Sequence, residues 1–108
     1  MEIKDVNQSK FLQIMGDSPI NRVLNFLVIN EDFDYSLTDI ARHSNVGYAT
    51  LQIFWRKIEN AGIVRQTRVV GKAKMYRLNK ESVLVTNFLK LYDSVIRLKL
   101  NEKMILAK

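Results

Sequence analysis

The sequence has no cysteine, one histidine and one proline among its 108 residues, and it has no long apolar run. The absence of cysteine excludes disulfides and thiolate metal sites. Because His43 is the only histidine, we expect neither a metal centre nor a bound cofactor. The apolar runs fall far short of the ~20 residues that span a bilayer, and residues 1–8 lack the apolar core of a signal peptide. These absences predict a soluble, cytoplasmic chain with no membrane partner.

The sequence also lacks a recognisable catalytic set. It contains no phosphate-binding glycine loop, no serine–histidine–aspartate arrangement and no carboxylate pair in a suitable context. An enzyme is therefore the function class that the sequence supports least. The length of 108 residues is enough for one domain with a modest core but not for two.

Positive charge is concentrated in one short part of the chain. The net charge is +6, yet residues 1–55 carry four basic and seven acidic side chains. Residues 56–80 carry eight basic side chains and one acidic side chain. Localised charge of this kind is typical of a surface that binds a polyanion such as nucleic acid. The alternative interpretation is an ordinary solvated basic face. It is the weaker one, because the basic segment coincides with a helix-turn-helix pattern in residues 36–64.

Residues 36–64 contain two short helical patterns separated by a tight turn. Ser36 can cap the first helix, and Gly62 supplies the left-handed residue that often follows the end of a helix. The second helix, expected from about Tyr48 to Asn60, carries an apolar stripe formed by Leu51, Phe54, Trp55 and Ile58. Trp55 belongs to this stripe, so we assign it to the core. Two helices joined in this way form a helix-turn-helix, whose second helix can enter a DNA major groove.

Shorter signals place the remaining elements before residue 80. A short helix is expected over Ser9–Met15, ended by Gly16, and a helix from Pro19 to about Asn30 begins at the capping pair Ser18-Pro19. In the helix that begins at Pro19 we expect Ile20 to face inward and Arg22 and Asn25 to face outward. Tyr35 is expected in a very short strand, and the strands Ile63–Val70 and Ala73–Leu78 are expected to form a hairpin around Gly71.

The run T-D-I-A, the turn, the helix ending in E-N-A-G-I-V and the basic hairpin together resemble the winged helix-turn-helix regulators. In detail the chain is similar to the small archaeal members of the MarR/ArsR-like group. The resemblance covers roughly Pro19 to Asn79 and is most specific at Thr38–Ala41 and Glu59–Val64. It implies a mostly helical α+β fold with a two-stranded wing. It divides the chain into an N-terminal segment (1–16), a winged helix-turn-helix domain (17–79) and a C-terminal helix (80–108).

The last helix is expected to begin after a capping Asn79 and to run from Lys80 to about Ala107, roughly 40 Å at 1.5 Å per residue. Apolar residues with a heptad rhythm form one stripe along it: Leu84, Phe88, Leu91, Val95, Leu98 and Ile105. A second stripe lies beside it: Val85, Leu89, Tyr92 and Ile96. So wide an apolar face must be covered from two directions. We therefore predict a homodimer with a coiled-coil-like interface, the alternative being a helix folded entirely onto its own core.

The resemblance assigns two sets of residues to double-stranded DNA. The recognition-helix set is Tyr48, Ala49, Thr50, Gln52, Ile53 and Arg56. Gln52 can pair with adenine and Arg56 can reach guanine or a phosphate, whereas Thr50 suits helix packing or a phosphate better than a base. Ile53 departs from the polar or basic residue of many relatives and can only contact a thymine methyl group or pack. The set on the wing and its flanks, expected on phosphates or in a minor groove, is Lys57, Arg65, Arg68, Lys72, Lys74 and Arg77.

Three functions remain open from the sequence. The leading one is a homodimeric, nucleoid-associated transcriptional regulator, with repression the usual mode for such small proteins. The second is an architectural or plasmid-partition protein that coats DNA with little sequence preference. The third is a winged-helix protein-interaction module. Phe88 and Tyr92 could line a small-molecule pocket, but their spacing favours packing, and the sequence indicates no particular effector.

Overall fold

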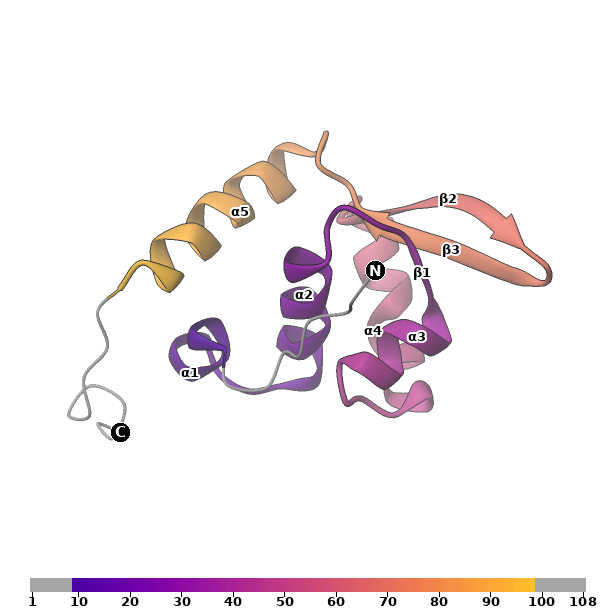
Figure 1. Cartoon of the computed structure of the whole chain (residues 1–108), viewed down its shortest axis with the longest axis horizontal. Coiled ribbons are helices and arrows are strands. Elements are labelled where there is room, and N and C mark those ends of the chain that lie inside the picture. The colour runs from indigo at the N-terminus through magenta and orange to yellow at the C-terminus, as the bar shows by residue number, and fades with distance from the viewer. Residues whose placement is uncertain (1–8, 99–108) are drawn as a thin grey trace.

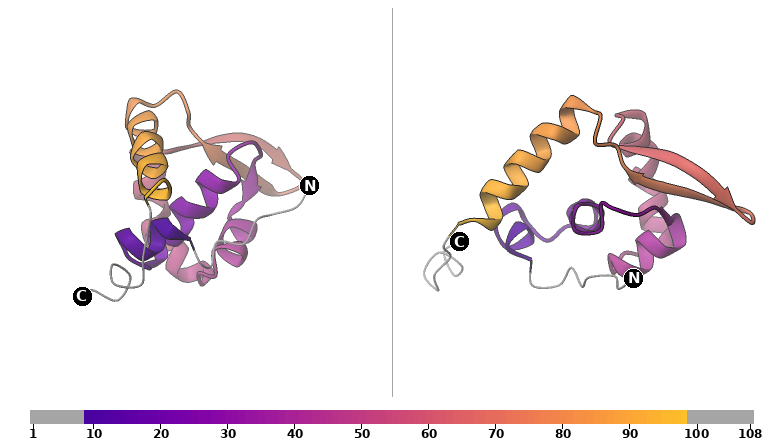
Figure 2. Two further views of the ribbon diagram at one scale, coloured as in Figure 1. Left: turned by 60° about the vertical axis from the view of Figure 1, so that its left-hand side comes forward. Right: turned by 45° about the horizontal axis from the view of Figure 1, so that its top comes forward.

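The computed structural model describes residues 9–98, which form an α+β fold of five helices and three strands within that range (Figure 1). The elements, in chain order, are α1 (Lys10–Met15), α2 (Pro19–Ile29), β1 (Tyr35–Ser36), α3 (Leu37–His43), α4 (Tyr48–Asn60), β2 (Val64–Val70), β3 (Ala73–Leu78) and α5 (Val83–Ile96). The sheet is antiparallel with the strand order β1-β3-β2. The hairpin β2–β3 projects from one side of the molecule, and α5 with α1 lies on the other (Figures 1 and 2). None of the helices within residues 9–98 is long and apolar enough to cross a membrane.

Serine side chains start four of the helices. Ser18 accepts a hydrogen bond from the Asn21 N–H, with Pro19 at the first helical position, and Ser36 accepts one from Asp39. Each hydroxyl satisfies one of the amide groups that a helix leaves free at its first turn. These two caps were predicted from the sequence and are confirmed. Ser9 and Ser82 cap α1 and α5 in the same way.

The core forms where the helices meet the inner face of the sheet. Trp55 is only 4% exposed and lies edge-on to Tyr76, with ring centroids 5.2 Å apart, so its assignment to the core is confirmed. The Phe26 ring contacts the Tyr35 ring from β1 edge-on and stacks with the His43 ring. The single histidine therefore packs against an aromatic ring. No group of three or more potential metal ligands exists in the described part of the chain.

The helix α2 departs from the predicted amphipathic pattern. It contacts α1, α3, α4 and β3, so neighbours cover it from several sides rather than along one stripe. Asn25, predicted to face outward, is fully buried, whereas Ile20, predicted to face inward, is 40% exposed. Both predictions were wrong because a helix at the centre of a small domain has no single solvent-facing side.

Asn25 joins three helices through its side-chain oxygen. The Ser9 hydroxyl, at the start of α1, donates to Asn25 Oδ1 at 3.0 Å, and the Tyr92 hydroxyl of α5 donates to the same oxygen at 2.6 Å. Beside this network the Phe11 ring packs against the rings of Phe88 and Tyr92, with centroid distances of 5.6 and 5.1 Å. These contacts hold α5 against α1 and α2, so Phe88, predicted at the dimer interface, packs with Tyr92 inside its own domain.

The C-terminal helix is shorter than predicted. It begins after Ser82 rather than Asn79, because the Asn79 side chain makes other hydrogen bonds. Its amide nitrogen donates to the Gly62 carbonyl, and its oxygen accepts from the Glu81 N–H. It ends at Ile96, where Lys10 Nζ donates to the carbonyls of Ile96 and Leu98 at 3.1 and 3.0 Å. A lysine that binds these carbonyl groups stabilises the end of a helix. The continuous helix from Lys80 to Ala107 was therefore a wrong prediction, and Ile105 lies outside the described residues.

The heptad stripe of α5 is divided between two environments. Val95 is 5% exposed and Phe88 is half-buried against the chain's own core, together with the buried Val85 and Tyr92. Val95 was predicted to face a second copy, but in this packing its own domain covers it. The stripe that remains at the surface is Leu84, Leu91 and Leu98, which are 54%, 45% and 40% exposed.

Candidate nucleic-acid interface

The predicted recognition residues lie together on the exposed side of α4. Leu51, Trp55 and Ile58 fix the orientation of this helix by burying its opposite side. We call the exposed side the α4 surface; it consists of Tyr48, Ala49, Thr50, Gln52, Ile53, Arg56 and Lys57. All seven side chains are accessible, so the helix presents a mixed polar, aliphatic and basic face to solvent. The structure thus brings together the whole recognition-helix set and adds Lys57 to it.

Hydrogen bonds to α3 and from α2 hold the turn between α3 and α4. Asn45 adopts a positive φ of 56°, in the left-handed region that asparagine tolerates better than most residues. The Val46 amide donates to the Ala41 carbonyl at 2.9 Å, and Arg22 Nη1 from α2 donates to the Asn45 carbonyl at 3.0 Å. Arg22 is in turn paired with Asp17. The angle between α3 and α4 is therefore anchored to α2, which gives α4 a rigid platform.

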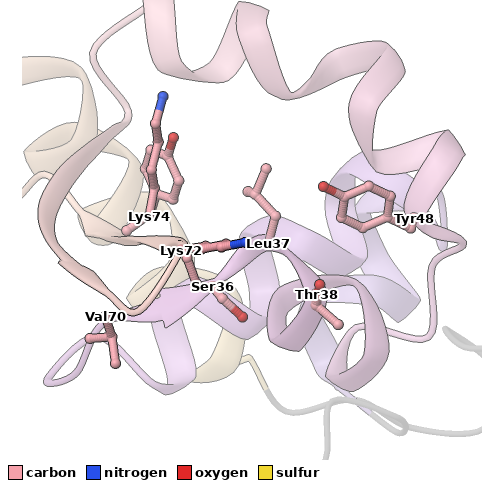
Figure 3. Close-up of a pocket in the computed structure, with 9 residues that line it drawn as sticks. Ser36, Leu37, Thr38, Tyr48, Val70, Lys72 and Lys74 are labelled. Carbon is pink, nitrogen blue, oxygen red and sulfur yellow. The ribbon is translucent and has the colours of Figure 1, made fainter.

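An open cleft of about 540 Å³ separates the start of α4 from the hairpin. We call it the hairpin cleft, and its lining is Ser36, Leu37, Thr38, Tyr48, Val70, Lys72, Ala73, Lys74 and Tyr76. Among these described residues the only charged ones are Lys72 and Lys74. In Figure 3 the Lys72 amine and the Tyr48 hydroxyl point toward each other across Leu37. Two cations and a hydroxyl around one opening form an arrangement suited to an anion.

The hairpin has two chemically different faces, which the strand register defines. Val64 lies opposite Leu78 and both are buried, so they mark the face toward the helices. Lys74 lies two residues from Tyr76 and therefore shares that inner face. Arg65 lies opposite Arg77, and each is the neighbour of a buried residue, Val64 or Leu78, so both belong to the outer face. The six residues predicted on the hairpin and its flanks are not brought to one surface.

Two arginines on the outer face of the hairpin, and Lys80 just after it, bind other residues of the chain. Arg68 binds Asp34 through two nitrogen atoms, at 3.0 and 3.1 Å, and Arg77 Nη2 donates to the Glu31 carbonyl at 2.9 Å. Lys80 lies 3.5 Å from a Glu31 carboxylate oxygen. Three of the eight basic residues between 56 and 80 are thereby occupied by residues 31–34, which we call the acidic loop. The sequence analysis did not predict that the acidic loop binds these basic residues, although Glu31, Asp32 and Asp34 place three carboxylates within four residues.

The other five basic residues of this segment are not bound by the acidic loop in the described part of the chain. Within residues 9–98 no ion pair involves Arg56, Lys57, Arg65, Lys72 or Lys74. Four of these five belong to the α4 surface or line the hairpin cleft, and Arg65 lies on the outer face. The positive charge available to an external partner is therefore concentrated where α4 meets the inner side of the hairpin.

Asp34 also fixes the position of a bulge in the sheet. The register shifts between Gln66 and Arg68, so Thr67 is the extra residue, and its hydroxyl donates to the Asp34 carboxylate. Hydrogen bonds from Arg68, and then from Thr67, lower the pKa of Asp34 below its ordinary value. Because the native state favours the charged carboxylate, its stabilising contribution is present above the unfolded-state pKa of about 3.9 and is lost as the pH falls through the native pKa.

We expect the variant Asp34→Asn to be less stable than the parent protein by a few tenths to about 1 kcal/mol near neutral pH, as is usual for partly exposed ion pairs. This difference should shrink as the pH falls below about 4, since the parent carboxylate then becomes protonated. Urea unfolding of both proteins at several pH values measures it. A stability difference that stays constant down to the acid limit would show that the carboxylate charge does not hold the bulge.

Comparisons of the chain with protein-family models, with curated proteins and with solved structures find no match. The function is therefore inferred from the geometry and charge of the chain itself.

Proposed function

We propose that the protein is a winged helix-turn-helix, double-stranded-DNA-binding regulator of transcription. In this proposal α4 enters the major groove and the hairpin β2–β3 is the wing. The observation that carries it is the hairpin cleft, since Tyr48 of the α4 surface borders the same opening as Lys72 and Lys74, which form no ion pair within residues 9–98. The nucleoid-associated location in the cytoplasm follows from this function.

The α4 surface has the side chains that base reading requires. Gln52 is exposed and can accept and donate two hydrogen bonds at an adenine edge, and Arg56 can donate two to guanine. Both lie on a helix whose other side is buried in the core, so the helix backbone holds them in a fixed position relative to the rest of the domain. A rigid element of this kind gives the register that direct base reading needs.

The hairpin cleft supports the backbone contacts. Lys72 and Lys74 lie on the inner side of the wing, facing the same opening as the Tyr48 hydroxyl. Contacts of this type fix orientation and supply affinity with little sequence information. We leave Arg68 and Arg77 out of the DNA-contact set, because both already bind the acidic loop.

The proposal includes a homodimer formed through α5. Leu84 and Leu91 lie seven residues apart on one side of the helix, and the exposed Leu98 follows directly after its C-terminal cap, Arg97. A second copy that covers this stripe would relate two α4 helices by a two-fold axis. Such a dimer reads two half-sites about one helical turn apart, which predicts an inverted repeat as the target.

Selection from a pool of randomised DNA duplexes, at the physiological salt of about 0.15 M, tests the proposal. Enrichment of one inverted repeat is the expected result. Binding without any enriched sequence would instead favour an architectural or partition protein. Absence of binding would remove the DNA function and point to a protein partner.

The double variant Lys72→Ala/Lys74→Ala is expected to weaken binding to every duplex by roughly tenfold or more, because two phosphates lose their cations. The slope of log affinity against log salt concentration should become shallower by about 1.8, at about 0.9 per phosphate. Affinity measurements at several salt concentrations provide both values.

The matched control is Arg65→Ala/Arg68→Ala, which removes the same charge from the opposite face of the same hairpin. We expect its salt slope to stay within a few tenths of the parent value, since neither side chain faces the hairpin cleft. Equal losses in the two double variants would mean that net charge, and not the inner face of the wing, determines binding.

A further inference from the structure

Ile53 is the most exposed large apolar residue in the described part of the chain. Its exposed fraction is 77%, and it lies in the middle of α4 rather than at an end. Ala49 lies one turn before it, and Arg56 lies almost one turn after it. An aliphatic side chain thus occupies the centre of the α4 surface, the part that the proposed function places deepest in the groove.

Folding gives no reason for isoleucine at this position. The side chain contributes almost nothing to the core at this exposure, and a β-branched residue lowers helix stability relative to alanine, glutamine or lysine. The surroundings are basic, since neither Arg56 nor Lys57 forms an ion pair within residues 9–98. An apolar protein partner would have to desolvate these cations, whereas a DNA groove with flanking phosphates would neutralise them.

We propose that Ile53, together with the methyl group of Ala49, reads thymine methyl groups in the major groove. This inference rests on the proposed function and adds the chemical feature that the target must carry. The thymine C5-methyl group is the only methyl group that an unmodified base pair presents in the major groove, so it is the best complement of an aliphatic side chain there. Ala49 and Ile53 are four residues apart and lie on the same side of α4, so their methyl groups form one continuous patch.

In this proposal, neighbouring residues of the α4 surface have different roles. Arg56 and Gln52 recognise bases by hydrogen bonds, whereas Ile53 recognises thymine by shape and by exclusion of water. Each half-site should therefore contain at least one thymine at a fixed position, next to the base pairs that the polar residues read. A cytosine at that position would lose the apolar contact.

Substitution of deoxyuridine for thymidine tests the inference, because uracil lacks only the methyl group. The duplex enriched from the random pool is used with one thymine replaced at a time; if no sequence is enriched, a pool made entirely with deoxyuridine is used. We expect binding about fourfold weaker for each contacted methyl group, the effect of exposing one buried methyl-sized group. The variant Ile53→Ala should bind the thymine and uracil duplexes almost equally, and Ile53→Val should keep most of the difference.

The control variant is Val83→Ala, which truncates a similarly exposed apolar side chain (76%) on α5, outside the α4 surface. It should retain the parent ratio between thymine and uracil duplexes. Specific DNA binding with a thymine-to-uracil ratio near one at every position would overturn the inference and leave the proposed function intact. A ratio that persists in Ile53→Ala would also overturn it. Failure of all duplexes to bind, before any uracil is introduced, would reject both, and Ile53 would then belong to a protein interface.

Discussion

The variant Phe11→Ala is expected to lower the free energy of unfolding by about 3–5 kcal/mol, the usual cost of removing a buried phenylalanine. Phe11 is 1% exposed, and its ring contacts both Phe88 and Tyr92. Truncation would leave a cavity between α1 and α5 next to the hydrogen bonds of Asn25. Because a domain of this size is stable by only about 5–15 kcal/mol, the loss is a large part of the total. Urea unfolding followed by circular dichroism measures it.

The control for this experiment is Ile14→Ala on the same short helix. Ile14 is 40% exposed, so its truncation should change stability by no more than about 1 kcal/mol. If Phe11→Ala loses as little stability as Ile14→Ala, then α1 is not part of the core and α5 must be held by other contacts. A selective loss in Phe11→Ala would establish that the short α1 helix supports the C-terminal helix.

Local chemistry made several elements predictable from the sequence. A serine followed by proline, as at Ser18-Pro19, marks a helix start because the hydroxyl accepts an amide within the same turn. Gly62, with a φ of 76°, ends α4 as expected, since the left-handed conformation costs glycine little. Both signals involve residues only a few positions apart, so no knowledge of the tertiary structure was needed.

Long-range pairing was not predictable in the same way. The oxygen of Asn25 is satisfied by Tyr92, which lies 67 residues further along the chain, and Arg68 is held by Asp34, 34 residues before it. A polar residue on a helix ordinarily faces water, and an arginine in a basic segment ordinarily remains free. Both expectations fail when a partner from a distant element is brought within hydrogen-bonding distance.

The candidate interface was predictable in its helix but only partly in its hairpin. The positions facing away from Leu51, Trp55 and Ile58 follow from the period of one helix, and all of them are exposed. Assigning a hairpin residue to a face requires the strand register, and the bulge at Thr67 changes that register. The sequence therefore identified a basic hairpin without separating its inner lysines from its outer arginines.

The variant Leu91→Glu is expected to convert the proposed homodimer into a monomer. Leu91 is at the centre of the exposed stripe, and a two-fold axis would place two new carboxylates in the same apolar interface. Burial of an unpaired carboxylate costs several kcal/mol, and the dimer would contain two of them. Light scattering coupled to size-exclusion chromatography measures the mass. Affinity for an inverted repeat should also fall by roughly 10²–10⁴-fold, because the two half-sites are no longer bound by linked domains.

Thr86→Glu is the matched control, since it adds the same charge to an exposed position on a different side of α5. Thr86 is in the first turn, where a carboxylate interacts favourably with the helix dipole, so this variant should remain folded and dimeric.

A parent protein with monomer mass would remove the dimer from the proposal. A dimer that persists in Leu91→Glu would move the interface elsewhere, and α1 is the first alternative because its Ile14 and Met15 side chains are 40% and 45% exposed. Because Leu91 lies outside both the α4 surface and the hairpin cleft, the variant should retain the weak, salt-sensitive binding of a single half-site.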